Sequence, residues 1–228
     1  VGDLPDRYDV LLKGMMTDIE IFREENIPLD TAVTKLDTEY NEICGAQTVE
    51  FDGEEKTFAQ MAIYLENTDR AVREAAWRAV SERRFEDSER VSEIYDELIR
   101  IRHQIATNAG FDGYQHYMFA AMHRFDYSID HCLEFHDSIE AVCQPLRHKT
   151  DAERKQALGV ESLRPWDMGV DVKGRPPLTP FTDVQDMIDG CSRIFHSMSD
   201  ELGDLFDQLD ANDCLDLESR KGKAPGGY

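Results

Sequence analysis

The sequence predicts a mainly α-helical protein with one small β-hairpin and a terminal strand. Apolar residues recur three and four positions apart along most of the 228 residues, a spacing typical of amphipathic helices. Capping residues and helix-ending glycines separate these periodic segments. We expect about eight to ten helices, and strand in less than about a tenth of the chain.

The first two helices are expected at 9–26 and 30–45. Both carry an apolar stripe at helical spacing. Pro28 should separate them, because proline is poorly tolerated inside a helix. Gly45 is a plausible glycine just past the end of the second helix.

A β-hairpin is expected next, where the helical period breaks. Asp52 and Gly53 lie between two short runs, 48–51 and 54–57, and Asp-Gly favours a two-residue hairpin turn. A Thr-x-x-Gln capping box then opens a short helix over 57–66.

The rest of the chain is expected to be mostly helical, with a short strand at 170–172. Pro145 should kink or divide the longest helix. The helix expected at 88–109 carries apolar residues spaced three, four, three and four, which predicts a seam packed along neighbouring helices. The helices are expected at 69–85, 88–109, 114–123, 129–158, 183–198 and 200–209.

The last fifteen residues, 214–228, differ in kind from those before them. Apolar and charged residues alternate over 215–220, which predicts a terminal strand. Pro-Gly-Gly at 225–227 suits a sharp turn or a close backbone approach. Because the chain stops there, and opens at Val1 without an initiator methionine, we expect a fragment of a larger protein.

Composition excludes several classes of partner. The net charge is 25 − 47 = −22, which argues against binding nucleic-acid phosphates or an anionic membrane surface. Solubility is the plain interpretation of this charge, and an acidic surface that attracts cationic peptides is the alternative. The five cysteines show no CxxC spacing, which suits free thiols in a reducing cytoplasm. No signal peptide or long apolar run occurs.

No catalytic or metal-binding residue is predicted in the chain. A zinc peptidase of the HExxH type needs two histidines one helical turn apart. His116 and His123 are seven positions apart, and His131 and His136 are five apart. Asp112 and His116 could share a face, and Glu134, His136, Asp137 and Glu140 form a polar helix face. We interpret these groups as caps or solvated surface.

Two segments carry weaker functional interpretations. Trp166, with Pro165 and Asp167, predicts a clamp between helices more readily than a substrate contact. The basic run Arg220, Lys221 and Lys223 should pair with carboxylates of the chain itself. The alternative for this end of the chain is substrate binding. The residues that would then approach bound peptide are Gly226, Gly227 and Tyr228.

Five segments carry a family resemblance. In order they are GFDGYQHYMF, RFDYS, FHDSIEAV, LGVESLRPWD and the terminal DLESRKGKAPGGY. They resemble, in the same order, segments of oligoendopeptidase F enzymes in the thimet oligopeptidase family of zinc metallopeptidases. In that family an HExxH helix lies further downstream, and this sequence ends before it.

The resemblance implies a zincin-type oligopeptidase fragment in two parts. Residues 1–67 would form an N-terminal helical lobe with the hairpin, and residues 68–228 the N-terminal helical part of the catalytic domain. The parent would use zinc to hydrolyse internal bonds of short peptides, with its zinc and catalytic residues outside this chain. The fragment's partners would be the remainder of the catalytic domain or a second copy of itself.

A second hypothesis is a complete, non-catalytic acidic helical binding or scaffold protein. The terminal strand without a partner and the missing initiator methionine argue against it. The reading frame after Tyr228 discriminates between the two hypotheses, because only the enzyme requires an HExxH motif there.

Overall fold

The computed structural model describes residues 5–224 and 226, and they form two compact units. Unit 1 comprises the described residues of Val1–Cys44, Arg84–Val160 and Ala224–Tyr228, and unit 2 comprises Gly45–Arg83 and Glu161–Lys223. The described part contains nine α-helices and one two-stranded sheet, so the predicted mainly α fold is confirmed. The expected boundary between residues 67 and 68 remains a prediction.

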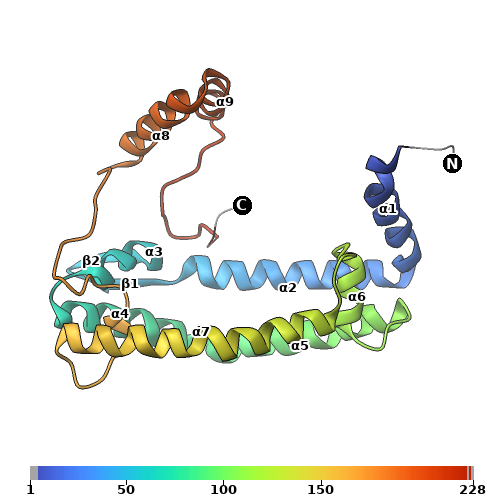
Figure 1. Cartoon of the computed structure of the whole chain (residues 1–228), viewed down its shortest axis with the longest axis horizontal. Helices are drawn as coiled ribbons and strands as arrows, with labels where there is room; N and C mark the ends of the chain where they lie inside the picture. Colours follow the sequence, from blue (N-terminus) through green and yellow to red (C-terminus); the bar gives the residue numbers. More distant parts are fainter. Residues whose placement is uncertain (1–4, 225, 227–228) are drawn as a thin grey trace. The chain divides into compact units, whose positions relative to one another are not determined.

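Unit 1 is built almost entirely of helices, shown in Figure 1. Its α1 and α6 contact each other, and α6 also contacts α5. A short 3₁₀ turn, Glu24–Asn26, leads into α2. The helices are α1 (Asp9–Ile21), α2 (Ile27–Ala46, which ends in unit 2), α5 (Ser88–Asn108), α6 (Tyr114–Ala121) and α7 (Ile129–Leu158).

The core of unit 1 follows α5. Ile94, Leu98, Ile101 and Ile105 are all buried, and their spacing of four, three and four places them on one face, as the predicted seam requires. The side chain of buried Asn26 donates to the Ile105 carbonyl at 3.1 Å. Its own oxygen accepts from the Asn108 amide at 2.8 Å. A polar group therefore enters this core with both ends of its amide hydrogen-bonded.

The first helices differ from the prediction in where they divide. Helix α1 ends at Ile21, because Phe22 adopts an extended conformation. Helix α2 begins at Ile27, so Pro28 lies in its first turn and does not separate the helices. The reason is that the first N–H groups of a helix have no partner within it, so a proline there loses no hydrogen bond.

Helix α7 has the predicted bounds and is not divided at Pro145. The hydroxyl of Ser128 accepts from the His131 N–H at 3.3 Å, which caps the start of α7. Gly159 ends α7 with φ 65°, a left-handed conformation that glycine adopts without strain. None of the described residues of α7 is buried, and the apolar side chains of Phe135, Val142 and Leu146 are exposed.

Unit 2 contains the predicted hairpin. Strands β1 (Thr48–Phe51) and β2 (Glu54–Thr57) pair antiparallel, with Thr48 opposite Thr57. Asp52 and Gly53 both have positive φ, 55° and 80°, as a tight hairpin turn of the Asp-Gly type requires. The capping box at Thr57 opens α3 (Phe58–Met61), which continues as a 3₁₀ helix, Ala62–Glu66.

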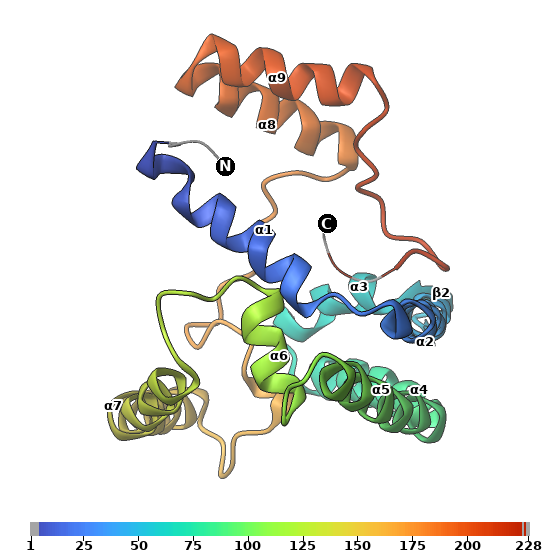
Figure 2. The same cartoon turned by 90° about the vertical axis from the view of Figure 1, so that its right-hand side faces the viewer.

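A small core holds the β-hairpin against α3 and against α4 (Arg70–Glu86). Val49, Met61 and Ala76 are buried together, and Phe51, Tyr64 and other half-buried apolar residues pack against them. Farther along the chain, α8 and α9 lie side by side as a helical hairpin (Figure 1 and Figure 2). The remaining helices of unit 2 are α4 (Arg70–Glu86, continuing into unit 1), a 3₁₀ turn (Pro165–Asp167), α8 (Val184–Met198) and α9 (Asp200–Ala211).

Two predicted strands are wrong. Residues 170–172 and 215–220 form no strand in the structure, although the second has the alternating pattern of one. A strand requires a neighbour to complete its backbone hydrogen bonds, and within the described residues the only paired strands are β1 and β2. Local alternation in the sequence does not supply that neighbour.

None of the helices in the described part of the chain combines the length and the apolar character that crossing a bilayer requires.

Candidate functional site

The C-terminal segment carries the site residues predicted from sequence, and its basic side chains are all paired. Arg220 donates two hydrogen bonds to Asp216, at 2.6 and 2.8 Å. Lys223 lies 3.3 Å from the same carboxylate, and Lys221 lies 2.6 Å from Glu55. Hydrogen bonds from Arg220 and then from Lys223 lower the pKa of Asp216 to about 2. The basic run therefore pairs with carboxylates of the chain, as predicted.

Backbone and hydroxyl contacts dock this segment on the hairpin and on the end of α2. The N–H of Gly222 donates to the Gly45 carbonyl at 2.7 Å. The hydroxyls of Thr57 and Ser219 lie 2.7 Å apart. A Cβ at Gly45 would lie 3.0 Å from the carbonyl oxygen of Lys223. Gly45 therefore permits a close approach of two backbones. It lies inside the last turn of α2, which ends at Ala46, so its predicted place just past the end of the helix is wrong.

Replacing Gly45 with alanine is expected to loosen this docking. The added methyl group meets backbone atoms of Lys223, which cannot rotate away as a side chain would. The amide of Gly222 should then exchange with solvent about tenfold faster, because a loss of about 1.4 kcal/mol from local protection corresponds to that factor. Hydrogen exchange followed by NMR measures it.

Gly190→Ala in α8 is the matched control, because only the end of the Arg193 side chain lies near its added methyl group. Unchanged exchange at Gly222 in the Gly45 variant would contradict the docking that we describe.

Of the three predicted substrate-binding residues, one lies in the described part of the chain. Gly226 is exposed and has φ 107°, a conformation that L-residues rarely adopt. Gly227 and Tyr228 lie outside the described residues. Contact of these three residues with a peptide remains a prediction.

The segment around Trp166 forms a buried ionic cluster. The Asp167 carboxylate is fully buried and accepts from Arg70 at 2.8 and 2.9 Å and from Arg73 at 3.3 Å. The backbone N–H of Arg164 also donates to it, at 3.0 Å. The hydrogen bonds from Arg70 lead in lowering the pKa of Asp167 to about 2, against the opposing effect of burial.

Aromatic and cationic groups complete this cluster. The rings of Trp77 and Trp166 lie 5.4 Å apart, and the guanidinium of Arg78 lies 5.2 Å from the Trp166 ring. Arg73 donates to the backbone carbonyls of Trp166 and Asn67, both at 2.8 Å. These contacts tie the loop after residue 160 to the start of α4, which favours the clamp over the substrate contact.

Two of the histidines considered in the sequence have hydrogen-bond partners within unit 1. Nδ1 of His131 accepts from the Ser128 N–H at 3.2 Å in the cap of α7. Nε2 of His123 lies 2.7 Å from Asp18. Glu134, His136, Asp137 and Glu140 are exposed on α7, as a solvated face should be.

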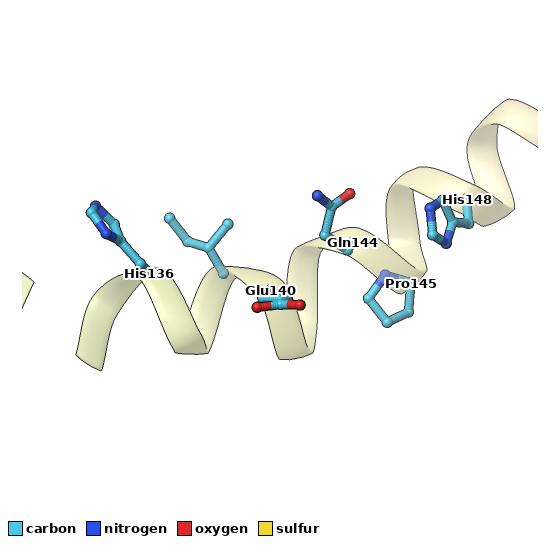
Figure 3. A pocket seen from close by; sticks show the side chains of 6 residues that line it. His136, Glu140, Gln144, Pro145 and His148 are labelled. Carbon is cyan, nitrogen blue, oxygen red and sulfur yellow. The ribbon is translucent and has the colours of Figure 1, made fainter. Parts of the chain in front are cut away.

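A hollow of about 540 Å³ lies along α7. Six residues line it, and all six belong to α7. They are Ile139 and the five labelled in Figure 3: His136, Glu140, Gln144, Pro145 and His148. A surface with walls from a single helix does not bring chemical groups to bear on a ligand from several sides, as binding sites do. We assign it no chemistry.

The sequence analysis did not predict one group of hydrogen-bonded polar side chains, which lies in the α8–α9 hairpin. Asp207 accepts from Ser192 at 2.7 Å and lies 2.9 Å from Nε2 of His196. Both partners bind the same carboxylate, so the histidine is not placed as a base for the serine, as nucleophilic catalysis requires. The buried Gly203 lets the ring approach, because a Cβ there would lie 2.1 Å from His196 Nδ1.

The His196–Asp207 pair predicts a pH dependence. The hydrogen bond to Asp207, aided by the charges of Asp204 and Asp200, raises the pKa of His196 above 6.5. Because the pKa of His196 is raised in the folded chain, the pair stabilises the α8–α9 hairpin fully at pH values below the ordinary pKa of histidine. This contribution is lost as pH rises through the pKa of the folded chain. NMR titration of His196 should show the raised pKa, and Asp207→Asn should lower it. An unchanged pKa in that variant would refute the assignment.

The family resemblance implies zinc, but the described residues form no site that could bind it. Within residues 5–224 and 226, no three histidine, cysteine, aspartate or glutamate side chains gather closely enough to hold a metal ion. We therefore derive no metal-dependent step from them.

Comparison with known proteins identifies relatives. The sequence model of Peptidase family M3 matches residues 63–228. A structure described as oligoendopeptidase F from Bacillus anthracis strain Ames is similar to 96% of the chain, at 26% identity and a TM-score of 0.89. A second oligoendopeptidase F structure gives 26% identity and 0.88, and PZ peptidase A with an inhibitor gives 27% and 0.89, each again over 96% of the chain.

The chain spans about two fifths of these structures, since the matches cover 40%, 38% and 39% of their chains. No curated protein sequence matches it. The matches confirm the resemblance inferred from the sequence.

Proposed function

Because the chain belongs to peptidase family M3, we propose that it is the N-terminal part of a zinc-dependent oligopeptidase that hydrolyses internal bonds of short peptides. The observation that supports this most is the structural match over 96% of the chain to oligoendopeptidase F. In this proposal, residues 1–67 form a helical lobe and residues 68–228 the first part of the catalytic domain.

The zinc and catalytic residues belong, in this proposal, outside the 228 residues. The seven histidines include no pair four positions apart, which the HExxH motif needs. Bound zinc would supply a Lewis acid and an activated water. This chain would supply part of the helical shell, and Gly226, Gly227 and Tyr228 would approach the peptide.

Exposed apolar faces of several helices support the proposal that the chain binds a partner. Phe135, Val142 and Leu146 on α7 are 63%, 61% and 59% exposed, and they lie on one face of the helix. Leu205 on α9 and Ile19 on α1 are also exposed. Faces of this kind are usually covered, and the remainder of the catalytic domain is the partner that we propose.

A second copy of the chain is the alternative partner. Size-exclusion chromatography with light scattering distinguishes a dimer from a monomer.

Free thiols accord with a cytoplasmic location, which we also propose. They are those of Cys44, Cys132, Cys143, Cys191 and Cys214.

The reading frame after Tyr228 tests the enzyme proposal. An HExxH motif there supports it. A stop codon directly after Tyr228 would instead favour the non-catalytic scaffold.

A further inference from the structure

A second hollow, of about 430 Å³, opens within unit 1 where α1, α6 and the end of α5 meet. Figure 2 shows α6 close to α1, and the two helices are in contact. This volume falls within the range of small-ligand sites. Unlike the hollow along α7, it has walls from several segments, so groups can converge on one ligand.

Much of the lining is aromatic. Phe111, Phe119 and Phe125 all line the hollow, and each is half-buried. Phe111 packs edge-on against Tyr117, and Phe119 against Tyr127, both at 5.7 Å between ring centres. These contacts hold the rings in place, so an apolar ligand would meet a preformed surface.

Of the two arginines that line the hollow, Arg23 serves the fold. It donates to the carbonyls of Asn108 and Ala109 at 3.1 and 3.2 Å, and to those of Glu20 and Phe22 at 2.8 and 2.7 Å. Cations favour the last carbonyls of a helix, so Arg23 caps the end of α5. It has little hydrogen-bonding capacity left for a ligand.

Arg124 is the other arginine of the lining. It is half-buried, and its guanidinium lies 5.2 Å from the ring centre of Phe119. No carboxylate in the described part of the chain forms an ion pair with it. The one carboxylate of the lining belongs to Glu20, which is exposed at the rim. In a chain of net charge −22, the hollow thus presents two guanidinium groups against one carboxylate.

We propose that this hollow binds the C-terminal residue of a short peptide. The terminal carboxylate pairs with Arg124, whose planar fork suits bidentate contact with a carboxylate. An aromatic or large aliphatic side chain packs among Phe111, Phe119 and Phe125. The site deepens the proposed function, because it names apolar C-terminal residues as the preferred substrate or product end.

Binding of N-acetylphenylalanine to the 228-residue chain, followed by NMR shifts, tests the proposal. The acid should bind at least about tenfold more tightly than N-acetylphenylalaninamide, as expected from a hydrogen-bonded charge pair. Arg124→Gln should reduce binding of the acid to the level of the amide, and Arg124→Lys should give an intermediate value. Arg147→Gln, an exposed arginine of α7, is the matched control and should leave binding unchanged.

Three outcomes would overturn the site: no binding, equal binding of acid and amide, or an Arg124→Gln variant that binds the acid as the native chain does. If Arg124→Gln fails to fold, the comparison of acid with amide on the native chain decides. 3-Phenylpropionate keeps the ring and the carboxylate without the amide, so binding as tight as that of the acid would refute the peptide assignment. The assay involves no cleavage, so its failure leaves the peptidase proposal standing.

Discussion

Replacing Asp167 with alanine is expected to lower the free energy of unfolding by about 3–5 kcal/mol, because it breaks a buried ion pair and strands a charge. Arg73 is only 3% exposed and would lose the carboxylate that neutralises it. Its remaining partners are backbone carbonyls. Urea denaturation followed by circular dichroism measures the loss.

Asp171→Ala provides the matched control four positions away. Asp171 pairs with Arg175, which is 70% exposed, and exposed ion pairs contribute about 0–1 kcal/mol. Equal losses in the two variants would contradict the special role of the buried cluster.

Acid should weaken the same cluster in a defined direction. The folded pKa of Asp167 is lowered from 3.8 to about 2. A lowered pKa stabilises the fold above the ordinary value, and this contribution is lost as pH falls toward the folded value. The stability difference between the native chain and Asp167→Asn should therefore be constant above about pH 5 and shrink toward pH 2.

Local signals in the sequence predicted the elements that depend on local physics. Asp52 and Gly53 located the hairpin turn, because few residues accept two successive positive φ angles. Ser128 and Gly159 gave the bounds of α7 through its caps.

Signals that depend on distant partners did not appear in the sequence. The alternation over 215–220 resembled a strand, but no neighbouring strand pairs with it within the described residues. The pairing of Arg220 with Asp216 four positions away could be anticipated. The partner of Lys221, Glu55, lies 166 positions away, and periodicity says nothing of such contacts. Arg70 and Arg73 likewise reach Asp167 across more than ninety positions.

The largest functional effect is expected when the 228-residue chain is compared with the longer parent that we propose. The parent should cleave short peptides, and the chain alone should not, because the HExxH histidines and glutamate that we place downstream are needed for metal-assisted attack on the peptide bond. Loss of the catalytic groups removes a rate enhancement of many orders of magnitude.

The most direct measurement is cleavage of a quenched fluorescent oligopeptide by both proteins, with and without a chelator, together with their zinc content after dialysis. We predict chelator-sensitive cleavage and about one bound zinc for the parent, and neither for the 228-residue chain. Chelator-sensitive cleavage by the short chain would contradict the placement of the chemistry outside it. A zinc-loaded parent that cleaves no peptide would contradict the peptidase assignment itself.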